Sequence, residues 1–155
     1  MKHKISNLAV ILGASLIVVT AAAQEKRIQK SDLPTAVQKA MESESAGSTI
    51  RGYSSEVEEG QQEYEVETVK NGHSRDISFA PDGQVLEVEE QVELANLPSR
   101  VRDALHAKAG SGNITKVESI TKQGKLVAYE AKVQKAGKKH EIQVGPDGEP
   151  LAHEE

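Results

Sequence analysis

The residues with the most chemical potential in this sequence are carboxylates that recur at alternate positions. Alternation puts every second side chain of a strand on the same face. If the segments that carry them are neighbouring strands, one sheet face gathers seven acidic residues: Glu56, Glu58, Glu63, Glu65, Glu67, Glu87 and Glu89. Such a face would steer a basic partner or a cation. The alternative is an ordinary solvated face that opposes aggregation.

An aromatic residue joins these carboxylates as a candidate for partner binding. Tyr53 follows Gly52 on the first of the acidic segments and has no counterpart in the second half of the chain. Exposed aromatic side chains are frequent anchors at interfaces. The alternative for Tyr53 is packing in the core or at the edge of the sheet.

Other reactive side chains do not form a recognisable site. The sequence has no Cys, and its histidines after residue 23 lack the close spacing of zinc ligands. The turn at Asp82 lacks the alternating acidic ligands of a calcium loop. No Gly-x-Ser-x-Gly motif occurs, and His73 and Ser74, as strand neighbours, would point to opposite faces. We therefore predict no catalytic residue, no metal site, no cofactor and no enzymatic activity.

The first 23 residues have the pattern of a secretory signal peptide. Lys2 and Lys4 precede an uncharged apolar run at 8–19, and Ala21 and Ala23 supply the small residues of a cleavage site. Twelve apolar residues would cover only about 18 Å as a helix, too little for a membrane span. We predict cleavage between Ala23 and Gln24 and a periplasmic or secreted protein without membrane attachment.

Two halves of the remaining chain repeat one another. At an offset of 64 residues Leu33, Pro34, Val37, Ala40 and Ile50 match Leu97, Pro98, Val101, Ala104 and Ile114. At an offset of 65, Tyr64, Glu65, Ile77, Pro81, Asp82, Gly83, Leu86, Glu89 and Glu90 match Tyr129, Glu130, Ile142, Pro146, Asp147, Gly148, Leu151, Glu154 and Glu155. Matches that keep their order on apolar and turn positions indicate duplication of one unit. The predicted repeats are 24–90 and 91–155.

Each repeat is predicted to be one helix followed by four strands. Apolar residues from Leu33 to Met41 follow helical spacing, and the second repeat has a similar stripe from Leu97. Beyond each helix, turn signals such as Asn71 with Gly72 separate segments of alternating hydrophobicity. The fold class is therefore α+β, with two tandem repeats, each one α-helix packed on a four-stranded antiparallel sheet. A unit of this size is marginal alone, so we expect the repeats to share a core.

The repeated motifs resemble those of a known family. Leu-Pro-x-x-Val at a helix start, Tyr-Glu strands and Ile-x-x-x-Pro-Asp-Gly-x-x-Leu, in two copies behind a signal peptide, resemble the PepSY-like family of secreted bacterial proteins. The resemblance implies the fold of β-lactamase inhibitor protein and an uncovered sheet surface that can bind a protein. It implies no catalytic residue, because the matching positions are packing and turn residues.

The net charges of the two repeats indicate which kind of partner to expect. Residues 24–90 hold 7 basic and 15 acidic residues, a net charge of −8, whereas residues 91–155 hold 10 and 9, a net of +1. A nucleic acid partner is not expected for such an acidic chain. We expect a non-enzymatic module that binds a periplasmic or secreted protein through its acidic sheet face, as an inhibitor or a chaperone. The alternative function is a sensor of a small ligand or of Ca²⁺ or Zn²⁺ at the same face.

Overall fold

A helix followed by strands occurs twice along the chain. The computed structural model describes residues 25–58, 60–153 and 155, so the predicted signal peptide lies outside the described residues. The elements are β1 (Lys26–Arg27), η1 (Lys30–Asp32), α1 (Thr35–Glu44), β2 (Thr49–Glu58), β3 (Gln61–Lys70), β4 (His73–Phe79), β5 (Val85–Gln91), η2 (Leu94–Asn96), α2 (Ser99–Ala109), β6 (Asn113–Lys122), β7 (Lys125–Lys135) and β8 (Lys138–Val144). Neither α-helix is long and apolar enough to cross a membrane.

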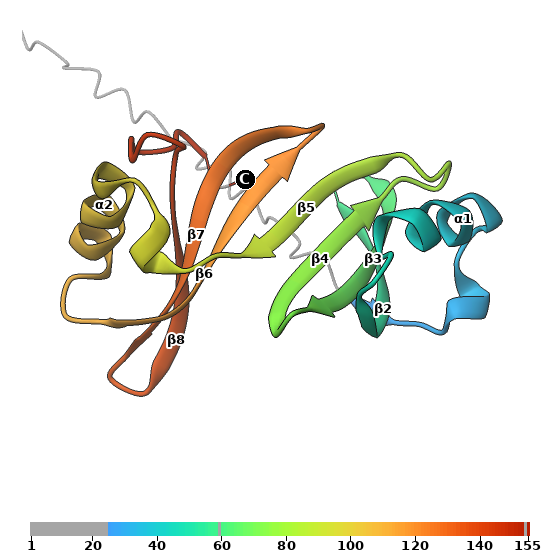
Figure 1. Cartoon of the computed structure of the whole chain (residues 1–155), viewed down its shortest axis with the longest axis horizontal. Coiled ribbons are helices and arrows are strands. Elements are labelled where there is room, and N and C mark those ends of the chain that lie inside the picture. The colour runs from blue at the N-terminus through green and yellow to red at the C-terminus, as the bar shows by residue number, and fades with distance from the viewer. Residues whose placement is uncertain (1–24, 59, 154) are drawn as a thin grey trace, which may run out of the picture.

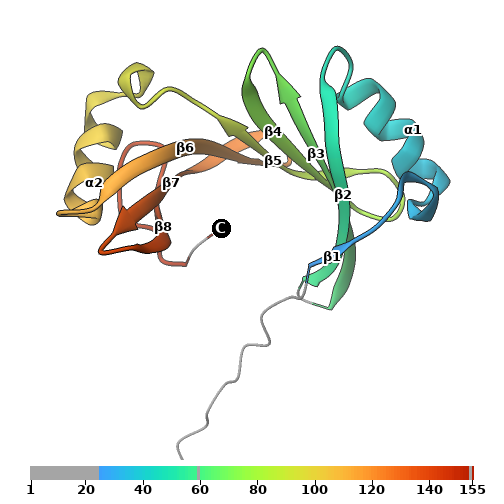
Figure 2. The ribbon, with the colours of Figure 1, turned by 90° about the horizontal axis from the view of Figure 1, so that it is seen from below.

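All eight strands belong to one antiparallel sheet, in the order of the sequence. The two halves join where β5 pairs with β6, with Val88 opposite Thr121 and Glu90 opposite Ser119. Opposed residues share a face, so the register carries the helix-covered face of the first half continuously into the second. The helices α1 and α2 lie at opposite ends of the longest axis with the sheet between them (Figure 1). Both cover the same face, and the sheet arches with the helices on its outer side (Figure 2).

The apolar residues form two clusters, one beneath each helix. In the first, Val37 and Met41 of α1 pack on Val66, Ile77 and Phe79. In the second, α2 packs on β6, β7 and β8 through Val101, Leu105, Ala109, Val117, Ala131, Val133 and Val144. The expectation of a core shared by both repeats is therefore wrong. Each helix covers its own half of the sheet, and the halves are joined by strand pairing.

The second half has three strands where four were predicted. The turn after β8 forms as its counterpart does, with the Gly148 N–H donating to the Gly145 carbonyl at 2.9 Å. The next residue to pair would be Pro150, which stands at the position of Val85, the first residue of β5. Pro offers no N–H to the ladder where pairing would begin. Residue 155 instead bonds a side chain of β8, its N–H donating to Gln143 Oε1 at 2.8 Å.

The Pro-Asp-Gly turns press against the backbone of the helices. A Cβ on Gly83 would lie 2.7 Å from the carbonyl oxygen of Ala36, and one on Gly148 would lie 2.6 Å from that of Arg100. Both glycines also have positive φ, at 87° and 84°. Ala36 and Arg100 are 64 residues apart, so the same close contact occurs in both halves. These turns require glycine because they seat each helix on its strands.

Replacing Gly83 by Ala is expected to lower the free energy of unfolding by about 2 kcal/mol, because the new methyl group meets helix backbone and the residue keeps a left-handed conformation. Gly124 is the matched control. It has a similar φ of 76°, but nothing lies within 4 Å of its Cβ position, so Gly124→Ala should cost about 1 kcal/mol. Urea unfolding of both variants measures the difference. Equal losses would show that the contact with α1 contributes nothing.

Candidate binding site on the helix-free face

The helix-free face of the sheet carries the acidic residues, and strand register explains their arrangement. Residues that oppose one another across adjacent strands form rows on this face. One row is Ser54, Glu65, Ser78, Glu87 and Lys122, and the next is Glu67, Asp76, Glu89 and Ile120. The face lies on the inner side of the arch, where the C-terminal residue is also found (Figure 2). The side chains therefore converge.

Most of the predicted acidic residues line one cavity. It has a volume of about 100 Å³ and is lined by Ser78 and seven carboxylates: Glu56, Glu58, Glu63, Glu65, Asp76, Glu87 and Glu89. Six of these were expected from the alternation, and Asp76 is the addition. Among the described residues that line the cavity, none is basic. The alternation along β2, β3 and β5 thus places these side chains together as the sequence indicated.

Two of the predicted residues stand apart from this cavity. Glu67 lies on the same face but forms an ion pair with Arg27 of β1. Tyr53 opposes Val66, whose side chain is fully buried beneath α1, so Tyr53 lies on the helix-covered face. It is half-buried against the first apolar cluster. Its assignment to the acidic face is therefore wrong. Along β2 the even-numbered residues, such as Glu56, lie on the helix-free face, whereas the odd-numbered Tyr53 lies on the opposite face.

The carboxylates that line the cavity are partly buried and repel one another. Burial, with the carboxylates of Asp76, Glu25, Glu67 and Glu56, raises the pKa of Glu65 to about 7. Burial, with Glu118, Glu130 and Glu87, raises the pKa of Glu89 to about 8. The pKa values of Glu56, Glu63 and Asp76 are raised as well, in each case mainly by burial. Near neutral pH this site takes up either protons or an external positive charge.

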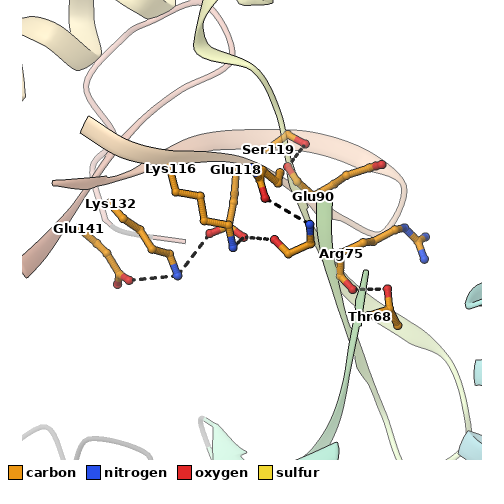
Figure 3. A network of polar contacts seen from close by, with 10 residues as sticks. Thr68, Arg75, Glu90, Lys116, Glu118, Ser119, Lys132 and Glu141 are labelled. Carbon is orange, nitrogen blue, oxygen red and sulfur yellow. Dashed lines mark hydrogen bonds and ion pairs between the residues drawn. The ribbon is translucent and has the colours of Figure 1, made fainter. Parts of the chain in front are cut away.

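Beside the cavity, an ion network surrounds a buried carboxylate of β6. Glu118 is 1% exposed, and Lys116 and Lys132 both reach it, with Lys132 Nζ 3.3 Å from Oε2 (Figure 3). Ser74 Oγ donates to its other oxygen at 3.3 Å. Lys132 also pairs with Glu141 at 3.4 Å. Burial alone would lower the pKa of Lys132, but Glu118, Glu141 and Glu130 together outweigh that effect and raise it.

The second half of the face is more enclosed than the alternation suggests. Glu130 and Gln143 lie on this face, because Glu130 opposes Glu118 and Gln143 opposes Glu130 in the strand register, yet they are only 7% and 5% exposed. Gln143 Nε2 donates to Glu130 Oε2 at 3.0 Å. Lys122 links the two halves, because its Nζ lies 3.2 Å from Glu87 and 3.4 Å from Glu155. The arch of the sheet, with the C-terminal residue beneath it, buries these polar groups.

The residues missed by sequence reasoning are Asp76 and the ion network of the second half. Asp76 is on the outward phase of its strand, so alternation could have included it. Glu118 has no such signal, because its burial depends on how sharply the sheet bends between β5 and β6. Within the part of the chain that the structure describes, the one group of three potential metal-ligating side chains is Asp76, Glu89 and Glu118, and it contains no His.

Comparison with known proteins agrees with this architecture. The family model described as "Putative beta-lactamase-inhibitor-like, PepSY-like" matches residues 19–74 and 62–149. Among curated proteins, none matches the chain.

Several solved structures share the fold. A chain from Bacteroides eggerthii, described among "putative periplasmic proteins", has a TM-score of 0.60 at 22% identity and covers 76% of this chain and 84% of its own. A BLIP-like protein from Bacteroides fragilis has a TM-score of 0.55 at 20% identity, covering 79% and 85%. A DUF2874 family protein from Bacteroides uniformis has a TM-score of 0.59 at 21% identity, covering 75% and 84%. At these identities the likeness shows the fold alone.

The two family matches together span most of the chain, and each includes strands of the acidic face. The order of a helix followed by strands, which occurs twice, is the order that the repeated motifs indicated. The two separate four-stranded sheets that were expected are instead one continuous antiparallel sheet. The chain belongs to the PepSY-like, beta-lactamase-inhibitor-like family.

Proposed function

We propose that this protein is a non-enzymatic binding module of the periplasm or of the secreted fraction, released by cleavage between Ala23 and Gln24. In this proposal it docks another protein on its helix-free sheet face and acts by occluding part of that partner's surface. Inhibition or chaperoning of the partner would follow. Tandem duplication of one helix-and-strands unit, 24–90 and 91–155, would supply the two arms of the arched face.

The observation that carries the proposal is the uncompensated charge of the cavity. In the described residues no Lys, Arg or His pairs with Glu56, Glu63 or Glu65. Holding such carboxylates together reduces stability. A partner whose surface presents Lys or Arg would neutralise them and would be attracted over a distance. The family's likeness to an inhibitor protein and the periplasmic description of a structural neighbour support this choice.

The proposal is tested by replacing three cavity residues together, Glu56→Gln, Glu63→Gln and Glu65→Gln, and capturing partners from a periplasmic extract on immobilised protein. The original chain should retain a discrete protein, and the triple variant should lose it. Moderate salt should weaken retention, because exposed charges are screened beyond about 8–10 Å at such ionic strengths.

A matched control changes the same charge on other surfaces, with Glu42→Gln, Glu90→Gln and Glu93→Gln. All three residues are exposed. This control should capture as the original does. A partner that the cavity variant still retains, or that both variants lose equally, contradicts docking at the cavity. Solution binding of the identified partner, measured with the same three proteins, then gives the affinity difference, expected to be at least about tenfold for three charges.

A further inference from the structure

Three carboxylates from consecutive strands of the sheet meet at one point of the helix-free face. Each of Asp76 on β4, Glu89 on β5 and Glu118 on β6 contributes an oxygen, and these oxygens all lie within 4.8 Å of one another. Asp76 and Glu89 are direct opposites in the register. Glu118 lies diagonally across from Glu89, because its own opposite residue is Gln91. The three backbone positions are therefore fixed by pairing.

One carboxylate oxygen of Glu118 is buried and accepts no hydrogen bond from the described residues. Its side chain is 1% exposed, and its Oε2 atom receives no hydrogen bond. Lys132 Nζ is 3.3 Å from this oxygen, which is an ion-pair distance, but it does not lie in a hydrogen-bonding direction. A buried carboxylate oxygen without a donor is costly. The geometry points to a missing ligand of positive charge beside Glu118.

The two lysines do not balance the local charge. Lys116 and Lys132 form ion pairs with Glu118, and Lys132 also pairs with Glu141. Asp76 and Glu89 have no ion-pair partner among the described residues, whose pairs are all accounted for elsewhere. With Glu130 close enough to act on both Glu89 and Lys132, five carboxylates face two ammonium groups.

We propose that Asp76, Glu89 and Glu118 form a Ca²⁺-binding site. Oxygen donors without His or Cys select a hard cation. Three oxygens within 4.8 Å of one another have a common point about 2.8 Å or less from each, which is short enough for direct coordination of one cation. Ca²⁺ fits better than Mg²⁺ because it accepts irregular sets of carboxylate oxygens, whereas Mg²⁺ requires nearly ideal octahedral geometry. Water completes the shell, since the cavity that Asp76 and Glu89 line is open to solvent. The site does not depend on the proposed protein partner.

The test is a titration of the purified, EDTA-treated protein with CaCl₂ at about pH 8, followed by calorimetry and by thermal melting. We expect one saturable site with a dissociation constant on the order of 10⁻⁴–10⁻³ M, as in extracellular calcium modules, and a rise in melting midpoint that saturates with it. MgCl₂ should bind at least about tenfold more weakly. Absence of saturable Ca²⁺ binding, or equal affinity for Mg²⁺, overturns the proposal.

Substitutions at the proposed ligands test where the Ca²⁺ ion binds. Asp76→Asn and Glu89→Gln should each weaken Ca²⁺ binding at least about tenfold and should remain folded, because each removes a repelling charge. Glu141→Gln is the matched control, since Glu141 pairs with Lys132 on the same face but lies outside the three ligands. It should change affinity by less than about twofold. Unchanged affinity in the first two variants, or an equal loss in Glu141→Gln, overturns the assignment.

A third variant separates cation binding from a purely structural network. Lys132→Met removes a positive charge 3.3 Å from Glu118 Oε2, so it should tighten Ca²⁺ binding by about threefold to tenfold. A network that only holds the strands together would show no such gain. Unchanged or weaker Ca²⁺ binding in a folded Lys132→Met variant counts against a cation beside Oε2.

Discussion

Glu65→Gln is expected to make the protein more stable by about 2–3 kcal/mol at about pH 8.5 and to leave its stability nearly unchanged at about pH 4.5. Burial and neighbouring carboxylates raise the pKa of Glu65 from 4.5 to about 7 in the folded protein. The folded state therefore binds more protons than the unfolded state between these values. Its free energy of unfolding falls as pH rises through that window and stays low above it.

Gln mimics the protonated form of Glu65 at every pH, so the variant escapes this loss. The full shift corresponds to about 3.4 kcal/mol at 1.36 kcal/mol per unit, and partial solvent access reduces it to the stated range. A gain of that size raises the melting midpoint by about 6–9 °C for a chain of this length. Urea unfolding at both pH values, with EDTA present so that no divalent cation contributes, measures the difference.

The control for Glu65 is Glu42→Gln on α1. Glu42 is exposed and lies 3.6 Å from Lys30, so its replacement should alter stability by less than about 0.5 kcal/mol at either pH. A Glu65→Gln variant that is equally stabilised at both pH values would show that the effect comes from packing or hydrogen bonding. One that gains nothing at about pH 8.5 would show that water reaches the cavity carboxylates freely.

The sequence predicted those features that depend on local periodicity. Both helices begin directly after Pro34 and Pro98, and Asn71 and Gly72 both have positive φ in the hairpin that their types indicated. Alternation placed the glutamates of β2, β3 and β5 on a single face because a strand has a strict period of two. Six of seven line the cavity for that reason.

What the sequence could not give are the features set by long-range geometry. Alternation predicts which face of the sheet a residue occupies, but it does not predict how exposed to solvent that face is. By alternation alone Glu130 and Gln143 would be solvent-exposed, yet the arch of the sheet buries them. The pairing of β5 with β6, which makes one sheet from two units, is specified by neither strand alone. The missing last strand could have been anticipated, since Pro150 replaces the Val85 of the first repeat.

The cavity and the buried ion network differ in how far their acidic residues are paired with lysines. The first half concentrates negative charge on β2 to β5, and the second half brings Lys116, Lys122 and Lys132 to the same face. These lysines reach Glu87 and Glu118 but none pairs with Glu56, Glu63 or Glu65. The lysines therefore compensate Glu87 and Glu118 at the joint between the halves, whereas the carboxylates on the arm of the first half keep their excess charge. That excess is available to a partner, whereas the charges at the joint hold the arch in shape.

Glu118→Ala is expected to lower the free energy of unfolding by about 3 kcal/mol, because it removes the acceptor on which Lys116 and Lys132 converge. Lys132 would keep Glu141 at 3.4 Å, while Lys116 would have no ion-pair partner among the described residues. Breaking a buried pair costs about 3–5 kcal/mol. The lower end applies here, since the lysine side chains are 25% and 40% exposed and since repulsion of Asp76 and Glu89 is relieved.

A double-mutant cycle with Lys132→Met distinguishes the ion network from simple loss of packing. Removing both partners should cost less than the sum of the single changes, with a coupling of about 1–2 kcal/mol. The cycle is measured by urea unfolding in EDTA, so that cation binding does not enter. Additive losses would mean that Glu118 stabilises the joint only by filling space. Coupling in the expected range would show that the arch is held by charges which, because the sheet bends at β5 and β6, have been taken out of water together.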